Sequence, residues 1–266
     1  ALLLLLLPLL NSGQAEGRAT PAAAARRGTS LRSQAGALLH WKSSIKYSSK
    51  HQLGTWGDDG MYPCNWTGIT CGDTLSRRGT MVKVITGISL DGAGIAGRLD
   101  KLGFQSLPYL VNLDLSDNYQ LSGAIPSGIG SLTMLSTLNF SGGQLDGNIP
   151  PSICSLGRLT HMDLSINNLT GHIPPALGNL SRLAFLYLPG NRLSGSIPWQ
   201  LGQLGSMRKM DLRWNVLSGH IPSSFANLTN LNYIDLSGNR LSGPIPEELG
   251  QVKTLQALSL AQNNLN

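Results

Sequence analysis

The stretch Leu159-Thr-His-Met-Asp-Leu-Ser-Ile-Asn-Asn-Leu-Thr-Gly-His-Ile-Pro174 decides the fold of this chain, because it recurs every 24 residues. The full copies that follow it start at residues 183, 207 and 231, and the copy before it starts at 135. A copy at 110–126 carries one extra residue, a degenerate first copy starts near Ile85, and an eighth runs from Leu255 to Asn266. Repeats of this length predict a stacked solenoid, since one copy cannot bury its own apolar side chains.

Each position of the pattern L-x-x-L-x-L-x-x-N-x-L-x-G-x-I-P has a physical role. The L-x-L segment alternates with period two, which predicts a half-buried strand. Burial of each Leu or Ile is worth about 1.5–3 kcal/mol. The central apolar position predicts one continuous core and holds Ile88, Leu113, Leu138, Met162, Leu186, Met210, Ile234 and Leu258.

Three further positions predict how each repeat turns. The Asn amide can bond backbone groups that the turn leaves unpaired. The Gly permits a tight turn, and the Pro that follows excludes a central strand. The Asn position holds Asn118, Asn167, Asn191, Asn215, Asn239 and Asn263, and the Gly position holds Gly123, Gly147, Gly171, Gly195, Gly219 and Gly243.

This pattern resembles the plant extracellular type of leucine-rich repeat, from about Ile85 to the end of the chain. The resemblance implies an α/β solenoid, a right-handed leucine-rich repeat superhelix with a parallel concave β-sheet and short irregular or 3₁₀ outer segments. We divide the chain into a signal peptide remnant (1–15), a disordered leader (16–32), an N-terminal cap (33–80) and the repeats (81–266), seven plus a truncated eighth.

The signal remnant is expected from the ten apolar residues at the start, which are too few to span a bilayer and precede a small-residue cleavage site. With no initiator Met and an incomplete last repeat, we expect the sequence to be a fragment. The leader is rich in Ala, Gly and Ser and carries four Arg, which is typical of disorder.

The segment 33–45 carries Leu38, Leu39 and Trp41 among polar residues, which predicts a short amphipathic helix. Cys64 and Cys71 bracket a short segment and are expected to form a disulfide in an oxidising compartment; a metal pair is the alternative. The whole stretch resembles the cap of plant leucine-rich repeat receptors. Residues 72–80 are interpreted as a loop longer than that pattern needs. Cys154 occupies a position for small residues and is interpreted as a buried thiol, with intermolecular pairing left open.

The formal charge of +6 is uneven. Residues 1–107 hold 12 Lys and Arg against 6 Asp and Glu, whereas 108–266 hold 8 against 8. The repeats therefore lack the basic face that nucleic-acid binding requires, and we predict no nucleic-acid partner.

Nothing in the sequence favours catalysis, a cofactor or a metal. Residues 92–97 match G-x-G-x-x-G, but they fall in the repeat register, where no βαβ unit is expected. Asp211 and Asp235 occupy one strand position in adjacent repeats and are interpreted as solvated carboxylates rather than a glycosidase pair. We predict that this chain is not an enzyme.

Exposed strand positions favour binding, because solenoids present extended surfaces. From repeat four (starting at 159) onward they gain aromatic and basic residues, the composition of a binding hot spot, with Ile166 beside them. The predicted ligand-binding residues are His161, Asp163, Phe185, Tyr187, Lys209, Asp211, Arg213, Trp214, Tyr233 and Asp235. Ordinary solvated strand residues are the alternative.

Five N-x-S/T sequons support secretion, at Asn65, Asn139, Asn168, Asn179 and Asn227. Asn139 is predicted to face the concave side. A glycan on it would direct a ligand toward repeats four to seven.

The resemblance implies the ectodomain of a plant leucine-rich repeat receptor-like kinase at the plasma membrane, which binds a peptide or protein ligand and recruits a leucine-rich repeat co-receptor. The paired R-x-R by which some relatives hold a peptide carboxylate is here Asp211-x-Arg213. We expect charge reversal of Arg213 together with Trp214→Ala to abolish peptide binding without unfolding. The alternatives are a secreted, polygalacturonase-inhibitor-like protein in the apoplast and a structural wall-adhesion protein.

Overall fold

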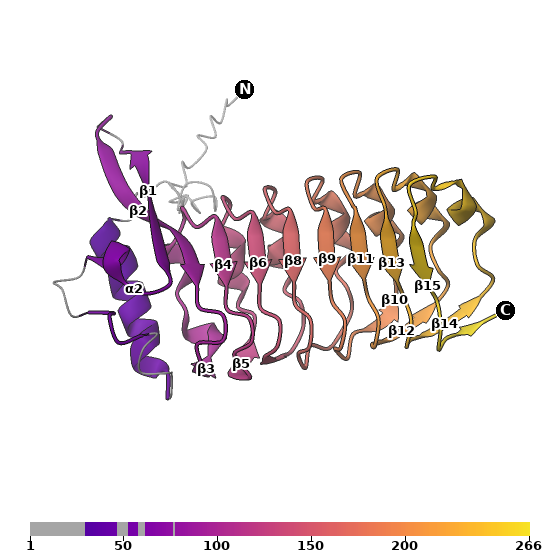
Figure 1. The fold of residues 1–266 in the computed structure, drawn as a ribbon, viewed down its shortest axis with the longest axis horizontal. Helices are drawn as coiled ribbons and strands as arrows, with labels where there is room; N and C mark the ends of the chain where they lie inside the picture. Colours follow the sequence, from indigo (N-terminus) through magenta and orange to yellow (C-terminus); the bar gives the residue numbers. More distant parts are fainter. Residues whose placement is uncertain (1–29, 47–52, 58–61, 77) are drawn as a thin grey trace, which may run out of the picture.

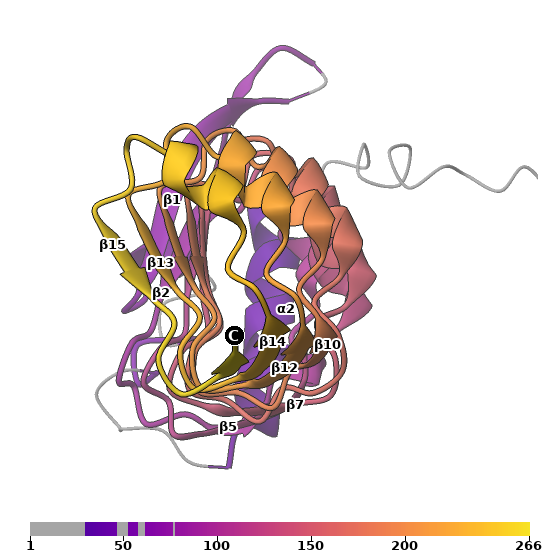
Figure 2. The ribbon, with the colours of Figure 1, turned by 90° about the vertical axis from the view of Figure 1, so that its right-hand side faces the viewer.

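The computed structural model describes residues 30–46, 53–57, 62–76 and 78–266. These residues form a solenoid whose repeats stack side by side, with the cap at one end (Figure 1). Viewed along the stack, a long sheet lies on one side, short strands lie on the opposing side, and 3₁₀ helices join them (Figure 2). The predicted solenoid is confirmed. The predicted signal remnant and almost all of the leader lie outside the described residues.

The long sheet has nine strands, and all of its neighbours are parallel except the first pair. In this sheet, every strand from β4 onward is three residues long, because the Asn position of the repeat bends the chain away soon afterwards. The strands, in spatial order, are β1 (Ile69–Leu75), β2 (Met81–Ser89), β4 (Asn112–Asp114), β6 (Thr137–Asn139), β8 (His161–Asp163), β9 (Phe185–Tyr187), β11 (Lys209–Asp211), β13 (Tyr233–Asp235) and β15 (Ala257–Ser259).

Two smaller sheets lie across the core from the long sheet (Figure 2). One contains β3 (Ala96–Arg98), β5 (Gln120–Ala124) and β7 (Gln144–Asp146), and the other contains β10 (Ser194–Ser196), β12 (Val216–Gly219), β14 (Arg240–Gly243) and β16 (Asn264–Leu265). The 3₁₀ helices are η1 (Pro63–Asn65), η2 (Leu99–Lys101), η3 (Phe104–Ser106), η4 (Ser127–Ser131), η5 (Pro151–Ser155), η6 (Pro175–Asn179), η7 (Trp199–Gln203), η8 (Ser223–Asn227) and η9 (Glu247–Gln251).

A ladder of buried asparagines ties the repeats together. Asn191 donates from Nδ2 to the carbonyls of Leu164 (2.9 Å) and Leu188 (3.2 Å), and its Oδ1 accepts from the backbone N–H of Leu169 (3.0 Å). Asn167, Asn215 and Asn239 repeat the same pattern. The predicted role of this Asn is confirmed, and each rung joins two neighbouring repeats. All six glycines of the Gly position have a positive φ, between 71° and 87°, which the tight turn of each repeat requires.

The cap covers the apolar end of the first repeat with helix α2 (Leu31–Ser44) and a tryptophan cluster. The rings of Trp41 and Trp56 lie 6.5 Å apart between centroids, and Trp56 stacks on Trp66 at 5.5 Å. Helix α2 begins at Leu31, capped by Ser30, so the last two residues of the predicted leader are helical.

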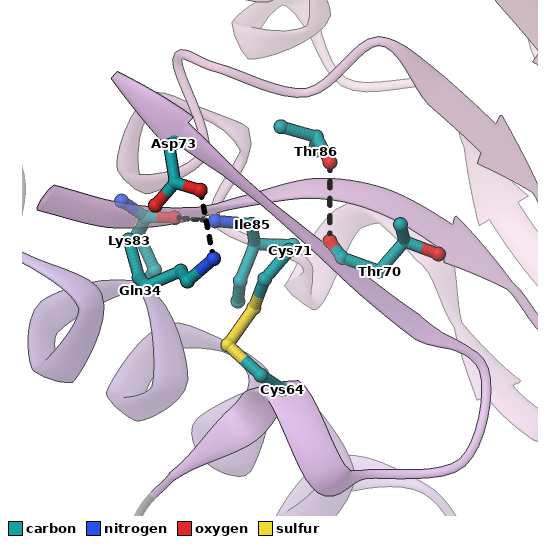
Figure 3. The surroundings of a disulfide bond; sticks show 8 residues. All are labelled: Gln34, Cys64, Thr70, Cys71, Asp73, Lys83, Ile85 and Thr86. Atoms are coloured by element: carbon teal, nitrogen blue, oxygen red, sulfur yellow. Dashed lines mark hydrogen bonds and ion pairs between the residues drawn. A yellow bond between two sulfur atoms is a disulfide. The ribbon is translucent and has the colours of Figure 1, made fainter. Parts of the chain in front are cut away.

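Cys64 and Cys71 form the predicted disulfide at the edge of the cap (Figure 3). Beside it, the buried Gln34 side chain of α2 accepts a hydrogen bond from the N–H of Ile85 on β2 at 2.7 Å (Figure 3). The interpretation of 72–80 as a loop was wrong over its first part, because β1 extends to Leu75 and pairs antiparallel with β2. Backbone pairing along this hairpin, with the Lys83–Asp73 ion pair at 2.8 Å, stabilises the extension.

No helix among the described residues is long and apolar enough to cross a bilayer.

Candidate binding surface on the long sheet

Eight of the ten predicted binding residues lie in two rows that cross the strands of the long sheet, and the other two, Arg213 and Trp214, lie in the turn after β11. The alternation of each strand turns its middle residue into the core, where Met162, Leu186, Met210 and Ile234 have no exposed surface. The flanking residues therefore share the solvent face. Backbone register places His161, Phe185, Lys209 and Tyr233 in the first row and Asp163, Tyr187, Asp211 and Asp235 in the second. These eight residues thus share one face of the long sheet, as predicted.

The first row carries a stacked aromatic pair. The His161 and Phe185 rings lie 4.3 Å apart between centroids with an interplanar angle of 14°. The His161 Nδ1 atom lies 2.8 Å from the Thr160 hydroxyl, which holds the ring in place. Burial lowers the pKa of His161, so the neutral imidazole is favoured. This pair offers an uncharged ring surface, followed along the row by the exposed amine of Lys209.

The second row serves the turn that follows each strand. Asp163 accepts hydrogen bonds from the backbone N–H and the hydroxyl of Ser165, and Asp235 accepts the same pair from Ser237. Asn139 binds Ser141 in the same way. These carboxylates and this amide therefore cap the turn, a structural role that the sequence pattern did not predict.

Tyr187 departs from this pattern for a physical reason. The residue two positions later is Pro189, which has no N–H to donate. A carboxylate at position 187 would therefore have no turn amide to cap. The position is free for a larger side chain, and Tyr187 stands between Asp163 and Asp211 in the row. Burial raises the pKa of the Tyr187 hydroxyl, and the two carboxylates raise it further.

Asp211 and Asp235 are not solvated, and that interpretation was wrong. Each residue is only 5% exposed, because Arg213 lies over both carboxylates. The Arg213 guanidinium reaches Asp211 Oδ2 at 3.4 Å and Asp235 Oδ2 at 3.5 Å, and the Tyr233 hydroxyl donates to Asp235 Oδ2 at 3.2 Å. Arg213 is therefore already paired.

Burial raises the pKa of Asp163 and of Asp211. At Asp235 burial acts in the same direction, but hydrogen bonds from Ser237 and Tyr233 outweigh it and lower the net pKa. The fold therefore disfavours the ionised form of Asp163 and Asp211, whereas it favours the ionised form of Asp235.

A rim formed by Ile166 and Trp214 borders the second row; both side chains were predicted beside this face, but their strained backbones were not. Ile166 (φ 52°) and Trp214 (φ 53°) have left-handed backbones, which are unfavourable for large side chains. They are 65% and 56% exposed. In the repeat after each of them, the same position is a glycine, Gly190 after Ile166 and Gly238 after Trp214. Ile166 packs against Gly190 and Trp214 packs against Gly238, so a Cβ added to either glycine would contact the large residue. This alternation of a large residue with Gly was the available signal.

The sequons lie on several sides of the molecule. Asn139 is on the long sheet, between Asp114 and Asp163, as predicted. Asn65, Asn168, Asn179 and Asn227 are exposed, and the last two end η6 and η8. Cys154 is a half-buried thiol without a disulfide partner among the described residues, and burial raises its pKa. Those residues contain no cluster of three or more metal-ligating side chains.

Comparison with known proteins agrees with this architecture. The model of the leucine rich repeat N-terminal domain matches residues 31–72, and leucine rich repeat models match 134–156, 158–180, 182–204 and 201–265. The chain is thus a leucine-rich repeat domain of the plant type with an N-terminal cap. It is homologous, over part of its length, to the ectodomains of leucine-rich repeat receptor-like kinases.

One such relative is the LRR receptor-like serine/threonine-protein kinase RGI3 of Arabidopsis thaliana, which is 37% identical over 109 residues. That alignment covers 41% of this chain and 9% of the relative, so the chain matches only a small part of the curated protein.

Solved structures that are similar to this chain include the following three. The ectodomain of the Arabidopsis thaliana receptor kinase GASSHO1/SCHENGEN3, in complex with CASPARIAN STRIP INTEGRITY FACTOR 2, has a TM-score of 0.78 and 34% identity over 87% of this chain and 27% of its own. The Arabidopsis receptor kinase HAESA, in complex with the peptide hormone IDA and the co-receptor SERK1, has a TM-score of 0.60 and 27% identity over 87% of this chain and 46% of its own. A plant ice-binding protein has a TM-score of 0.66 and 26% identity over 90% of this chain and 88% of its own.

Proposed function

We propose that this chain is the extracellular ligand-recognition unit of a plant receptor kinase. It binds a peptide or protein ligand on the solvent face of the long sheet in repeats four to seven. A kinase domain elsewhere in the protein carries the signal across the plasma membrane. The observation that carries the proposal is the strand register that puts Tyr187 and Tyr233 on one surface, beside the apolar rim of Ile166 and Trp214. Arg213 joins this surface from the turn after β11 through its ion pairs to Asp211 and Asp235.

The chemistry of that surface suits an extended ligand. Neighbouring strands of a sheet lie about 4.8 Å apart, so four strands offer about 15 Å of contact across the row. Aromatic side chains dominate the energy of such contacts, and flanking polar groups select the partner. The complex of HAESA with the peptide hormone IDA supports a peptide as the ligand, and the complex of GASSHO1/SCHENGEN3 with CASPARIAN STRIP INTEGRITY FACTOR 2 supports a role in ligand binding. The co-receptor SERK1 in the HAESA complex supports the predicted co-receptor as a further partner.

A glycan on Asn139 would support the same placement. Its position in the second row, one strand before Asp163, would put the sugar beside the start of the aromatic surface. The ligand would then contact repeats four to seven rather than repeat three. Glycopeptide mass spectrometry of the secreted protein is expected to find Asn139 occupied, and a bare Asn139 would remove this support.

The test is selective capture of a ligand. Extracellular fluid from the tissue that expresses the protein is passed over immobilised wild-type chain and over a Tyr187→Ala/Trp214→Ala variant. Bound peptides are identified by mass spectrometry. We expect a peptide that the wild type retains and the variant does not. Equal retention of every peptide by both proteins would contradict the proposed surface.

The alternative is a secreted inhibitor of cell-wall-degrading enzymes. The similarity to a plant ice-binding protein over 88% of that chain shows that this solenoid also occurs in a short protein of another function. Inhibition of a purified polygalacturonase by the chain would favour the inhibitor. Sequencing of the transcript beyond Asn266 separates the two: we expect an apolar run of about 20 residues followed by kinase motifs, and a stop codon there would favour the inhibitor.

A further inference from the structure

A groove of about 770 Å³ lies on the opposite side of the solenoid from the proposed peptide surface. It follows the segments that lead from β10 and β12 into η7 and η8, on the side away from the long sheet (Figure 2). Its volume is within the range typical of small-ligand sites, about 300–1,000 Å³. The proposed peptide site uses none of its residues.

A small residue between two large ones creates the groove. His172, Ser196 and His220 occupy the same position in three consecutive repeats. The His172 ring lies over Gly195 and the His220 ring lies over Gly243, where neither would leave room for a Cβ. Gly219 lies between Gly195 and Gly243, and the residue that faces it is Ser196, whose side chain is small. The result is a slot between two imidazole rings that lie over backbones about 10 Å apart, which is two strand spacings.

The walls of this slot are held in place. The His220 Nδ1 atom lies 3.1 Å from the carbonyl of Ser242 in the next repeat. The Ser224 hydroxyl donates to the carbonyl of Trp199 at 2.7 Å, which ties the start of η7 to η8. Trp199 is nevertheless 58% exposed at the edge of the groove. A large aromatic ring is thus presented to solvent on a fixed backbone.

The lining is aromatic and hydrogen-bonding, and it is free of formal charge. Hydroxyl, amide and imidazole groups come from Ser196, Gln200 and the two histidines, and the groove has no Asp, Glu, Lys or Arg among its lining residues. A ligand that carries charge would find no counter-ion there. A ring with an apolar face and several hydroxyl groups would match both the indole and the hydrogen-bonding groups. Those are the properties of a neutral pyranose.

We propose that this groove binds a neutral oligosaccharide. One pyranose ring stacks on Trp199, and the chain continues into the slot above Ser196, where the hydroxyl groups of the sugar meet the two imidazoles. The chain would then hold a polysaccharide on one side while the long sheet remains free for its own ligand.

The test is titration calorimetry of the purified chain with cellohexaose, xylohexaose and mannohexaose, and with hexagalacturonic acid as the charged counterpart. We expect at least one neutral hexaose to bind with a Kd below about 10 mM. Trp199→Ala is expected to weaken that binding at least tenfold, and Ser196→Trp, which fills the slot, is expected to remove it. Circular dichroism checks that both variants are folded.

Trp214→Ala is the matched control, since it removes an exposed tryptophan from the other side of the molecule. We expect it to leave oligosaccharide binding unchanged while it weakens peptide binding, so the two proposals fail separately. The oligosaccharide site is overturned if no neutral hexaose binds, if hexagalacturonic acid binds as tightly as the best neutral one, or if both groove variants bind like the wild type.

Discussion

Arg213 reaches from the turn after β11 to Asp235 on β13, where its Nη1 atom lies 3.5 Å from the carboxylate. Its Nε atom lies 3.4 Å from Asp211, so one guanidinium serves two nearly buried carboxylates in adjacent repeats. This arrangement changes the expectation from the sequence that charge reversal of Arg213 leaves the fold intact. A glutamate there would bring three carboxylates together, and Arg213 is for this reason a poor probe of ligand binding.

We predict that Arg213→Ala lowers the free energy of unfolding by about 1 kcal/mol at neutral pH. The value is modest because the guanidinium is partly exposed and its ion pairs are screened by solvent. The loss should shrink in acid, where Asp211 and Asp235 become protonated and need no cation. Urea denaturation at several pH values measures the effect.

Lys209→Ala is the control for this prediction, since Lys209 is exposed on β11, the strand that precedes Arg213, and forms no ion pair with a described residue. It should change stability by less than about 0.5 kcal/mol. Equal losses from the two substitutions would contradict the role assigned to Arg213.

Asp163→Asn should stabilise the chain at neutral pH. Burial raises the pKa of Asp163, so the folded protein binds its proton more tightly than the unfolded chain does. The charged carboxylate therefore destabilises the fold above that pKa, and this penalty disappears as the pH falls below the unfolded value near 4. Asn139 already makes the same bonds to Ser141 in the preceding repeat, so the amide fits the position.

Asp235→Asn should act in the opposite direction. The net pKa of Asp235 is lowered, so its charge stabilises the fold at neutral pH and the benefit is lost as the pH falls through the folded pKa. Thermal melts of both variants at pH 7 and pH 3 test the pair. Shifts of the same sign at pH 7 would contradict the different environments assigned to the two carboxylates.

Asn191→Ala should destabilise the chain by about 3 kcal/mol, because it leaves buried carbonyl and N–H groups of two repeats without partners. The neighbouring Arg192→Ala removes an exposed side chain and should have little effect. Urea denaturation of the two variants makes the comparison. A loss below about 1 kcal/mol for Asn191→Ala would contradict this prediction and mean that water takes over the hydrogen bonds of the Asn191 side chain.

Ile166→Gly should raise the free energy of unfolding by about 1 kcal/mol, because glycine adopts the left-handed backbone of this position without the strain of a β-branched side chain. Ile166→Val keeps the branching and should give no gain. The same glycine variant should weaken retention of the peptide ligand if the rim contacts it. Stability comes from chemical denaturation, and a net loss with glycine would show that the exposed isoleucine packs usefully.

Much of the fold was predictable because the same residue types recur at the same positions in every repeat. Leucines alternate along a strand, Asn191 and its equivalents have backbone groups to bind at every turn, and the Gly position always needs a positive φ. The rows of the candidate surface followed from the same register. The β1–β2 hairpin was missed because it falls outside the repeat, where Gly72 and the Arg pair at 77–78 favour a loop.

The sequence by itself determined the solenoid, its long sheet and the face on which Tyr187 and Tyr233 stand, since these depend on local periodicity that each repeat carries. Only the tertiary structure decided what those side chains contact. Asp211 and Asp235 are buried because Arg213 covers both, and Ile166 packs on a glycine one repeat away. Such contacts depend on the distances between side chains of different repeats, and the pattern of residue types does not specify those distances.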